Sequence, residues 1–379
     1  MAKGITWVGI DDHKLHLTVA VVVGQRQRDA EVSRVMNEDR ALRRWVRKLM
    51  RNAGGSEIRM CYEAGPNGFA LKRRLEAMGP IVVEVVAPSL TPRRSGQRVK
   101  TDPIDARKLV LLFRADELTE IATPSEGDEA ARDLVRTHAR VVVECTRKRH
   151  HILKFLVRRG RIYRDGSHWT QRHRRWLEQH QWEDWKDEAS FEELQTGLRE
   201  LEDRRHRLEQ LMERLAQEDE YRLAVAVLRC FHGIDTCAAM VLATEIFAIE
   251  RFRHPRDLAS YLGLTPTVRQ SAEKEHRGGI SKSGNRYVRW SLGKMAQQYR
   301  HRPHVGAGLK KRRQGQPAWA VAIADRAHHR LHRRYWALMN RGKPHNKVVT
   351  AVARELVSFV WEALREVRTR GLQEMPKAA

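Results

Sequence analysis

The run TWVGIDDHKLHLTVAVVVGQRQRDAEVSRVM, residues 6–36, decides the fold of the first part of the chain. It contains three short segments rich in β-branched residues, at 6–10, 17–23 and 31–36, with polar residues between them. Segments of this kind are typical of β-strands, and the short spacing between the first two suits a hairpin. The run therefore predicts three strands that follow one another closely.

Strand and helix patterns alternate after this run. Apolar residues recur at helical spacing over residues 42–49 and 69–78, and strand-like runs stand at 57–62 and 81–86. A further helix begins at Asp102. Three strands, a helix and then alternating strands and helices form the element order of a ribonuclease-H-like fold. Such a fold is a mixed sheet with helices on its faces.

The later part of the chain is predicted to be helical. Leucines recur there every seven residues, which indicates a coiled-coil-like seam, at Leu194, Leu201, Leu208 and Leu215. The alternative is a helix that packs on its own domain. We predict three regions: an α/β region at 1–125, a helical coiled-coil region at 126–222 and a mainly helical, glycine-punctuated region at 223–370.

Charge limits the partners of the chain. Its 379 residues include 72 Lys and Arg against 47 Asp and Glu, a formal net charge of +25. This excess attracts polyanions and argues against an enzyme for cationic substrates. A hydrophobic content of 41% excludes a wholly disordered chain.

Cysteine usage and hydropathy indicate the compartment. The four cysteines form no CxxC pair, which is typical of reduced thiols in a cytosolic protein. No apolar run approaches the roughly 18 residues of a membrane span, and charge follows the N-terminus too soon for a signal peptide. We therefore expect a cytoplasmic protein without a membrane partner.

Carboxylates stand where a ribonuclease-H-like fold performs chemistry. Asp11 follows the first strand, Glu63 ends the fourth, and Asp102 and Asp105 lie three apart at a helix start. Residues at i and i+3 share one helix face. Four convergent carboxylates would bind two Mg²⁺ ions, which prefer oxygen ligands. Two such ions about 3.5–4 Å apart can contact both the attacking and the leaving oxygen of a phosphodiester.

These carboxylates also have structural interpretations. An aspartate after a strand is common in turns, and Asp102 before Pro103, with Asp105 three residues on, suits helix capping. Capping and metal binding are compatible. Asp12 is an alternative to Asp11, since neighbouring side chains of a strand point to opposite faces. We choose Asp11 because it directly follows the Gly-Ile pair.

A second candidate site is the basic, glycine-rich stretch LGLTPTVRQSAEKEHRGGISKSGNR, residues 262–286. Such a loop offers backbone N–H groups and cations to phosphates. It has no GxxxxGK[ST] string, which argues against a nucleotide P-loop. The stretch predicts phosphate contacts, although a single serine in such a loop is more often a turn residue.

Five strings, GIDDHK, YEAG, KTDPIDARKL, YLGLTPTVRQS and GGISKSGNRYVR, occur in this order over nearly the whole chain. In these strings the sequence resembles the DEDD transposases, the bridge-RNA-guided insertion-sequence recombinases related to the Piv/MooV site-specific invertases. KTDPIDAR and GGISKSGN are the specific strings. The resemblance implies a RuvC-like domain joined by a coiled coil to a C-terminal transposase domain.

The resemblance also implies the site residues. The metal carboxylates of the family map onto Asp11, Glu63, Asp102 and Asp105, and its nucleophilic serine maps onto Ser271. Ser281 and Ser283 are the alternatives for the nucleophile. The implied reaction cuts and rejoins DNA through a phosphoserine intermediate, with Mg²⁺ as two ions, or Mn²⁺, as cofactor.

The sequence departs from the family at two places. Ala272 stands where a glycine often follows the serine, and residues 231–235 read FHGID where relatives read close to IPGIG. The latter string resembles a helix-hairpin-helix phosphate contact. The negative charge of Asp235 argues against that contact here.

Cationic and polar residues beside the two sites are predicted to bind nucleic acid through phosphates. They are Arg93, Arg94, Arg98, Lys100, Arg269, Lys274, Arg277, Lys282, Asn285, Arg286 and Arg289. Tryptophans interleaved with arginines could also stack on unpaired bases, or form the core of a small helical element, at Trp169, Trp176, Trp182 and Trp185.

Together with the charge and the placed carboxylates, the resemblance implies an RNA-guided transposase of an insertion sequence at the prokaryotic nucleoid. Its partners would be double-stranded donor and target DNA, a structured non-coding guide RNA and further copies of the chain in a dimer or tetramer. One alternative is a two-metal nuclease or Holliday-junction resolvase that uses water as nucleophile. Another is a non-catalytic nucleic-acid-binding protein, which the placed carboxylates argue against.

Overall fold

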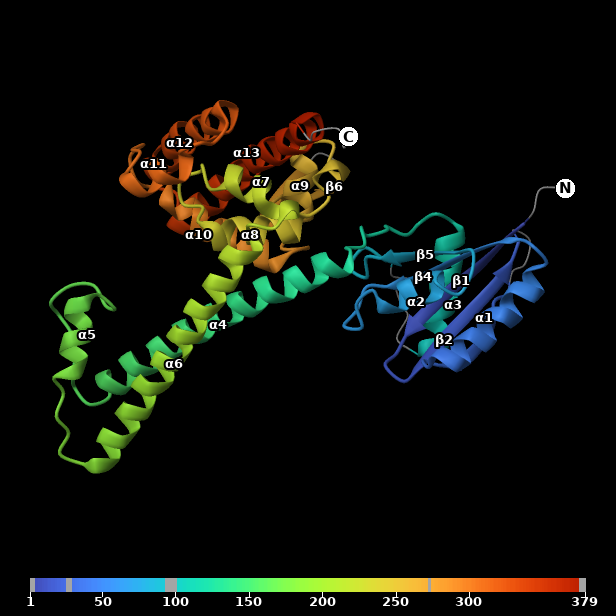
Figure 1. Cartoon of the computed structure of the whole chain (residues 1–379), viewed down its shortest axis with the longest axis horizontal. Coiled ribbons are helices and arrows are strands. Elements are labelled where there is room, and N and C mark those ends of the chain that lie inside the picture. Colours follow the sequence, from blue (N-terminus) through green and yellow to red (C-terminus); the bar gives the residue numbers. More distant parts are fainter. Residues whose placement is uncertain (1–3, 25–28, 93–100, 272–273, 375–379) are drawn as a thin grey trace. The chain divides into compact units, whose positions relative to one another are not determined.

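The computed structural model describes residues 4–24, 29–92, 101–271 and 274–374, with the backbone alone at 268–271, 274–277 and 371–374 (Figure 1). Contacts divide the chain into two compact units, residues 1–123 and 124–379. The predicted three-region division, with bounds at 125 and 222, stays a prediction.

A mixed five-stranded sheet forms the first unit, with strand order β3-β2-β1-β4-β5. β1, β2 and β3 are antiparallel neighbours, whereas β4 runs parallel to β1 and β5 runs parallel to β4. The predicted α/β sheet is confirmed and is consistent with a RuvC-like fold. The strands are β1 (Ile5–Asp12), β2 (His16–Val23), β3 (Glu31–Met36), β4 (Glu57–Glu63) and β5 (Ile81–Val86).

Helices cover both faces of this sheet. One face of β1, with Ile10, packs in a core with Val46 of α1 and the apolar side of α2. The other face packs on α3, and Gly9 permits the close approach: a Cβ there would lie 2.5 Å from the backbone nitrogen of Val110. The helices are α1 (Asp39–Ala53), α2 (Ala70–Glu76) and α3 (Asp102–Arg114).

Two long helices open the second unit, α4 (Glu126–Val157) and α6 (Trp185–Leu215). They pack side by side, and the leucine stripe of α6 faces α4: Leu208 is buried in one cluster with Val141 of α4, and Leu194 and Leu201 pack against that cluster. This packing within the unit matches the alternative to a coiled-coil seam. Association of two chains through the stripe stays a prediction.

The tryptophans of residues 169–185 mostly belong to the core beside α5 (Gln171–Glu178). Trp169, Trp176 and Trp182 pack against the α4–α6 cluster, and only Trp185 is widely exposed, at 71%. Core packing was the alternative to base stacking. This stretch therefore gives little support to RNA contact.

The rest of the second unit is helical around one large core in which α13 packs on α7, α9, α10 and α12. A two-stranded hairpin, β6–β7, interrupts it, which the sequence did not predict. Within the described residues no helix is both long and apolar enough to cross a membrane. The elements are α7 (Asp219–Leu228), α8 (Thr236–Ile246), a short 3₁₀ helix (Ile249–Arg251), α9 (Pro255–Tyr261), β6 (Pro266–Ser271), β7 (Lys274–Ile280), α10 (Arg286–Gln298), α11 (Ala307–Arg313), α12 (Ala318–Met339) and α13 (His345–Glu374).

Candidate active site

Asp11 and Glu63 occupy matched positions on neighbouring parallel strands. The register pairs Ile10 of β1 with Tyr62 of β4, so the next residue on each strand is a carboxylate. Residues paired in this way project to the same face of a sheet. That face is the one α3 covers, because Cys61, two residues before Glu63, packs against α3. Both carboxylates are half-buried there.

α3 brings Asp102 and Asp105 to the same face of the sheet in its first turn. Asp102 Oδ2 lies 3.7 Å from Nε2 of His16, at the start of β2 and therefore beside the end of β1. The N-cap of α3 is Thr101, so Asp102 is the first helical residue and does not cap the helix, contrary to the capping interpretation.

The donor chemistry of these four residues suits a divalent ion, since carboxylate oxygens are what Mg²⁺ prefers. In the described ranges, however, no group of three or more His, Cys, Asp or Glu side chains could hold a metal ion. Thr91 Oγ1 donates a hydrogen bond of 2.8 Å to Glu63 Oε1. The convergence of the four carboxylates on a shared ion stays a prediction.

Asp12 lies on the opposite face from Asp11. Asp12 is two residues after Ile10 on β1, so the two side chains project to the same face of the sheet, and Ile10 packs in the core with α1 and α2. Asn67 Nδ2 donates to the backbone oxygen of Asp12 at 3.2 Å. Burial raises the pKa of the Asp12 carboxyl, although Asn67, Arg74 and His13 oppose the shift. This position separates Asp12 from the face that α3 covers.

In the second unit, the turn after α9 and the glycine-rich loop pack directly on each other. A Cβ on Gly263 would lie 2.0 Å from the backbone oxygen of Ser283, and one on Gly284 would lie 1.8 Å from that of Tyr261. Both glycines have positive φ, 66° and 84°. Only glycine fits both the space and the conformation. The YLGLTP and GGISKSGN strings are therefore two halves of one local structure.

The β6–β7 hairpin stands between these strings. Ser271 pairs with Lys274 across the hairpin, so the backbone of Ser271 is at the turn end of β6. Its side chain is outside the described ones. Ser281 and Ser283, the alternatives, lie at the other end of the hairpin with their hydroxyl oxygens 3.0 Å apart.

Two family models match this chain. Residues 8–159 match the DEDD transposase model of IS110, and residues 225–308 match the model described as the transposase IS116/IS110/IS902 family. The chain is 36% identical over 363 residues to a putative transposase, y4qE, of Sinorhizobium fredii, covering 96% of this chain and 89% of the relative. The chain belongs to the IS110 family of DEDD transposases. It is also 28% identical over 345 residues to the transposase for insertion sequence element IS1533 of Leptospira borgpetersenii, covering 90% of this chain and 99% of the relative.

Family membership confirms the predicted enzyme class. The protein is an insertion-sequence transposase, a DNA recombinase that binds DNA, and its DEDD family implies use of a divalent metal. Which ion is used, and which residues hold it, belong to the proposal below.

The predicted nucleic-acid contacts of the transposase fall into four groups. Arg93, Arg94, Arg98 and Lys100 lie outside the described residues, and the hairpin carries Arg269, Lys274 and Arg277, whose backbone alone is described. Lys282 and Arg286 are exposed. Asn285 and Arg289 have structural partners: Asn285 accepts from the first turn of α10, and Arg289 Nη1 donates to the backbone oxygen of Leu262 at 2.9 Å. Nucleic-acid contact by any of them stays a prediction.

A basic groove of about 900 Å³ opens at the base of the hairpin, lined by Gly278, Gly279 and Ile280 of β7. Its one carboxylate among the described lining residues is Glu355, which is paired with Arg330 and Arg334. The groove therefore carries excess positive charge beside the predicted nucleophile's hairpin. Sequence reasoning missed its cations from α9 and α13 because only the fold brings them together; they are Arg256, Lys347 and Arg354.

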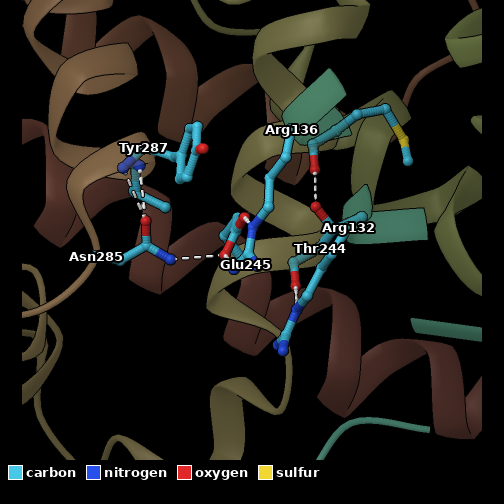
Figure 2. A network of polar contacts seen from close by, with 8 residues as sticks. Arg132, Arg136, Thr244, Glu245, Asn285 and Tyr287 are labelled. Atoms are coloured by element: carbon cyan, nitrogen blue, oxygen red, sulfur yellow. Dashed lines mark hydrogen bonds and ion pairs between the residues drawn. The ribbon is translucent and has the colours of Figure 1, made fainter. Parts of the chain in front are cut away.

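A buried carboxylate holds the glycine-rich loop in place (Figure 2). Glu245 is 1% exposed and accepts two hydrogen bonds from Arg136, at 2.6 and 2.9 Å, and one from Asn285 Nδ2 at 2.6 Å. Hydrogen bonding to Glu245 raises the pKa of Arg136. Asn285 is also the N-cap of α10. The network thus ties α4 and α8 to the end of the GGISKSGN string. The sequence gives no sign of this role, because Glu245 is there an ordinary polar residue in a mostly apolar helix.

Proposed function

We propose that this transposase cuts and rejoins DNA through a phosphoserine intermediate at Ser271, with Mg²⁺, as two ions, held by Asp11, Glu63, Asp102 and Asp105. One observation carries the metal assignment. Asp11 and Glu63 stand at matched positions on parallel strands, on the face whose covering helix begins with the other two aspartates.

The chain's own residues supply rigid placement of the ligands. Asp11 and Glu63 belong to central strands of the sheet, and Gly9 lets α3 approach closely enough to deliver its first turn to their face. Bound divalent ions would act as Lewis acids that stabilise charge developing on a phosphate. The role of the carboxylates themselves would be to bind the ions and to orient them.

Ser271 would act as the covalent nucleophile. Its hydroxyl oxygen bonds to phosphorus and loses its proton, while the bond from phosphorus to one deoxyribose oxygen breaks and that oxygen takes up a proton. One phosphoester replaces another, so a second strand's hydroxyl can reverse the step and rejoin the DNA. Support for Ser271 comes from the cations of its own hairpin, which suit DNA phosphates. The basic groove opens at the opposite end of the hairpin and would hold DNA there.

Guidance by a structured non-coding RNA completes the proposal. It rests on the family resemblance and on a net charge of +25, which exceeds what a small active site needs. In this reading the enzyme works as a dimer or tetramer in the cytoplasm, at the nucleoid. Treating the purified protein with RNase should then abolish recombination of a supplied DNA pair, and full activity afterwards would exclude RNA guidance.

The decisive experiment traps the covalent intermediate on a nicked donor DNA. Wild-type protein should carry a DNA strand that survives denaturation and maps to the peptide containing residue 271. Ser271→Ala should bind DNA normally yet neither cleave nor form the adduct, since alanine has no attacking atom. Ser281→Ala and Ser283→Ala are the matched controls and should retain the adduct.

Two results would contradict parts of this proposal. An adduct on Ser281 or Ser283 would keep the mechanism and reject Ser271. Cleavage without any adduct would favour the nuclease alternative, with water as nucleophile. For the metal site, Asp11→Asn should abolish cleavage while Asp12→Asn should not, and equal losses would reject the assignment of Asp11.

A further inference from the structure

A shallow groove on α12 presents an anchored tryptophan among cations. Trp336 is 44% exposed, and its indole N–H donates to the backbone oxygen of Arg300 at 2.9 Å. The polar edge of the ring is therefore satisfied and its orientation is fixed. Apart from that N–H, the indole is an apolar aromatic surface, the kind of surface that a base can cover.

The side chains around this ring carry positive or neutral charge only. One face of α12 and its end line the groove, since each of these positions lies three or four residues from another of them: 329, 332, 333, 336 and 340. Arg302, from the segment after α10, lines the same groove. None of the described lining residues is acidic, and neither Arg302 nor Arg333 has an ion pair within the described part of the chain.

We propose that this groove binds an unpaired nucleotide, with the base stacked on Trp336 and the flanking phosphates on Arg302 and Arg333. Duplex DNA hides the faces of its bases, so a stacking platform selects a single-stranded segment. Arginines without carboxylate partners are free to neutralise phosphates. An acidic peptide could also meet the arginines, but it has no planar group to cover the indole.

The proposal is independent of the serine mechanism and of RNA guidance. It concerns a face formed by α12 and the segment after α10, which none of the sequence-predicted site residues belongs to. The single strand could be RNA or a displaced DNA strand. The test therefore uses short oligonucleotides of both kinds, with a blunt DNA duplex as the third probe.

Binding of fluorescently labelled oligonucleotides to the full-length protein measures the effect. Trp336→Ala should weaken affinity for single strands by about 5- to 150-fold, the range expected for loss of one stacked base, and leave duplex affinity within about twofold. Trp336→Phe should retain most of the affinity, because it keeps an aromatic face. Trp290→Ala is the matched control, since Trp290 of α10 is also exposed, at 39%, but is not part of the α12 groove.

A direct readout is photocrosslinking of an oligonucleotide that carries 5-iodouracil, which should label the peptide containing Trp336. Loss of binding to RNA, to single-stranded DNA or to both supports the proposal and identifies the source of the strand. Unchanged single-strand affinity in a folded Trp336→Ala variant would overturn it. Equal weakening for duplex DNA, or competition by polyglutamate that depends on Trp336, would also overturn it.

Discussion

Replacing Arg136 by alanine should lower the free energy of unfolding, because the buried carboxylate of Glu245 loses its main partner. Glu245 is 1% exposed and accepts three hydrogen bonds, two of them from Arg136. The variant leaves the single bond from Asn285. Breaking a buried ion pair from one side costs about 3–5 kcal/mol. In a unit of this size, about 2–4 °C of melting temperature corresponds to each kcal/mol, so we expect a drop of about 6–20 °C.

Thermal unfolding followed by circular dichroism measures this drop. Arg140→Ala is the matched control: Arg140 lies one turn further along α4 and is exposed, so its loss should cost less than about 0.5 kcal/mol. The double variant Arg136→Ala with Glu245→Ala removes the orphaned charge as well, and should be less destabilised than the sum of the two single changes.

Function should respond to the same change. Asn285 joins Glu245 to the N-terminus of α10, so loss of the network should loosen the glycine-rich loop and reduce recombination. The reasoning would be refuted if Arg136→Ala melted within about 2 °C of the wild type. Strict additivity in the double variant would refute it as well, because it would show no coupling between the two side chains.

Two further changes test the first unit and the buried histidines. Gly9→Ala should displace α3 and reduce cleavage strongly, because the new Cβ would lie 2.5 and 2.6 Å from backbone atoms of Val110 and Ala106. Gly4→Ala is the control and should leave cleavage unchanged, because the nearest atom to its new Cβ is 3.9 Å away. Equal activity of the two variants would disprove the packing argument. Burial lowers the pKa of His328 to about 4, with stacked His232 as the next cause, so the unfolded chain binds its proton at a higher pH than the folded one. The stability that neutral His328 contributes should be present above about pH 6.5 and be lost as pH falls toward 4. The urea midpoint should therefore change less between pH 7 and pH 5 in His328→Phe than in the wild type. The same change in both proteins would contradict a buried, neutral His328.

The sequence by itself determined the first unit and the family. Runs of β-branched residues and their order predicted the mixed sheet, because strand formation follows a local pattern of period two and turns follow polar breaks. The strings that carry the resemblance are also local: KTDPIDAR is one helix start, and GGISKSGN runs from the end of β7 to the N-cap of α10. Family comparison then confirmed the transposase class.

Only the tertiary structure decided which surfaces meet. The sequence left Asp11 and Asp12 as alternatives, and the register of β1 with β4, together with the packing of Cys61 on α3, placed Asp11 on the covered face. The leucine heptad predicted a seam but not its partner, because an apolar stripe does not specify what covers it; the partner found here is α4 of the same chain. Glu245, the hairpin groove and Trp336 could not be predicted for the same physical reason. Each depends on contacts between segments far apart in the chain, such as Arg136 and Glu245 at a sequence separation of 109, and such contacts leave no periodic trace in the sequence.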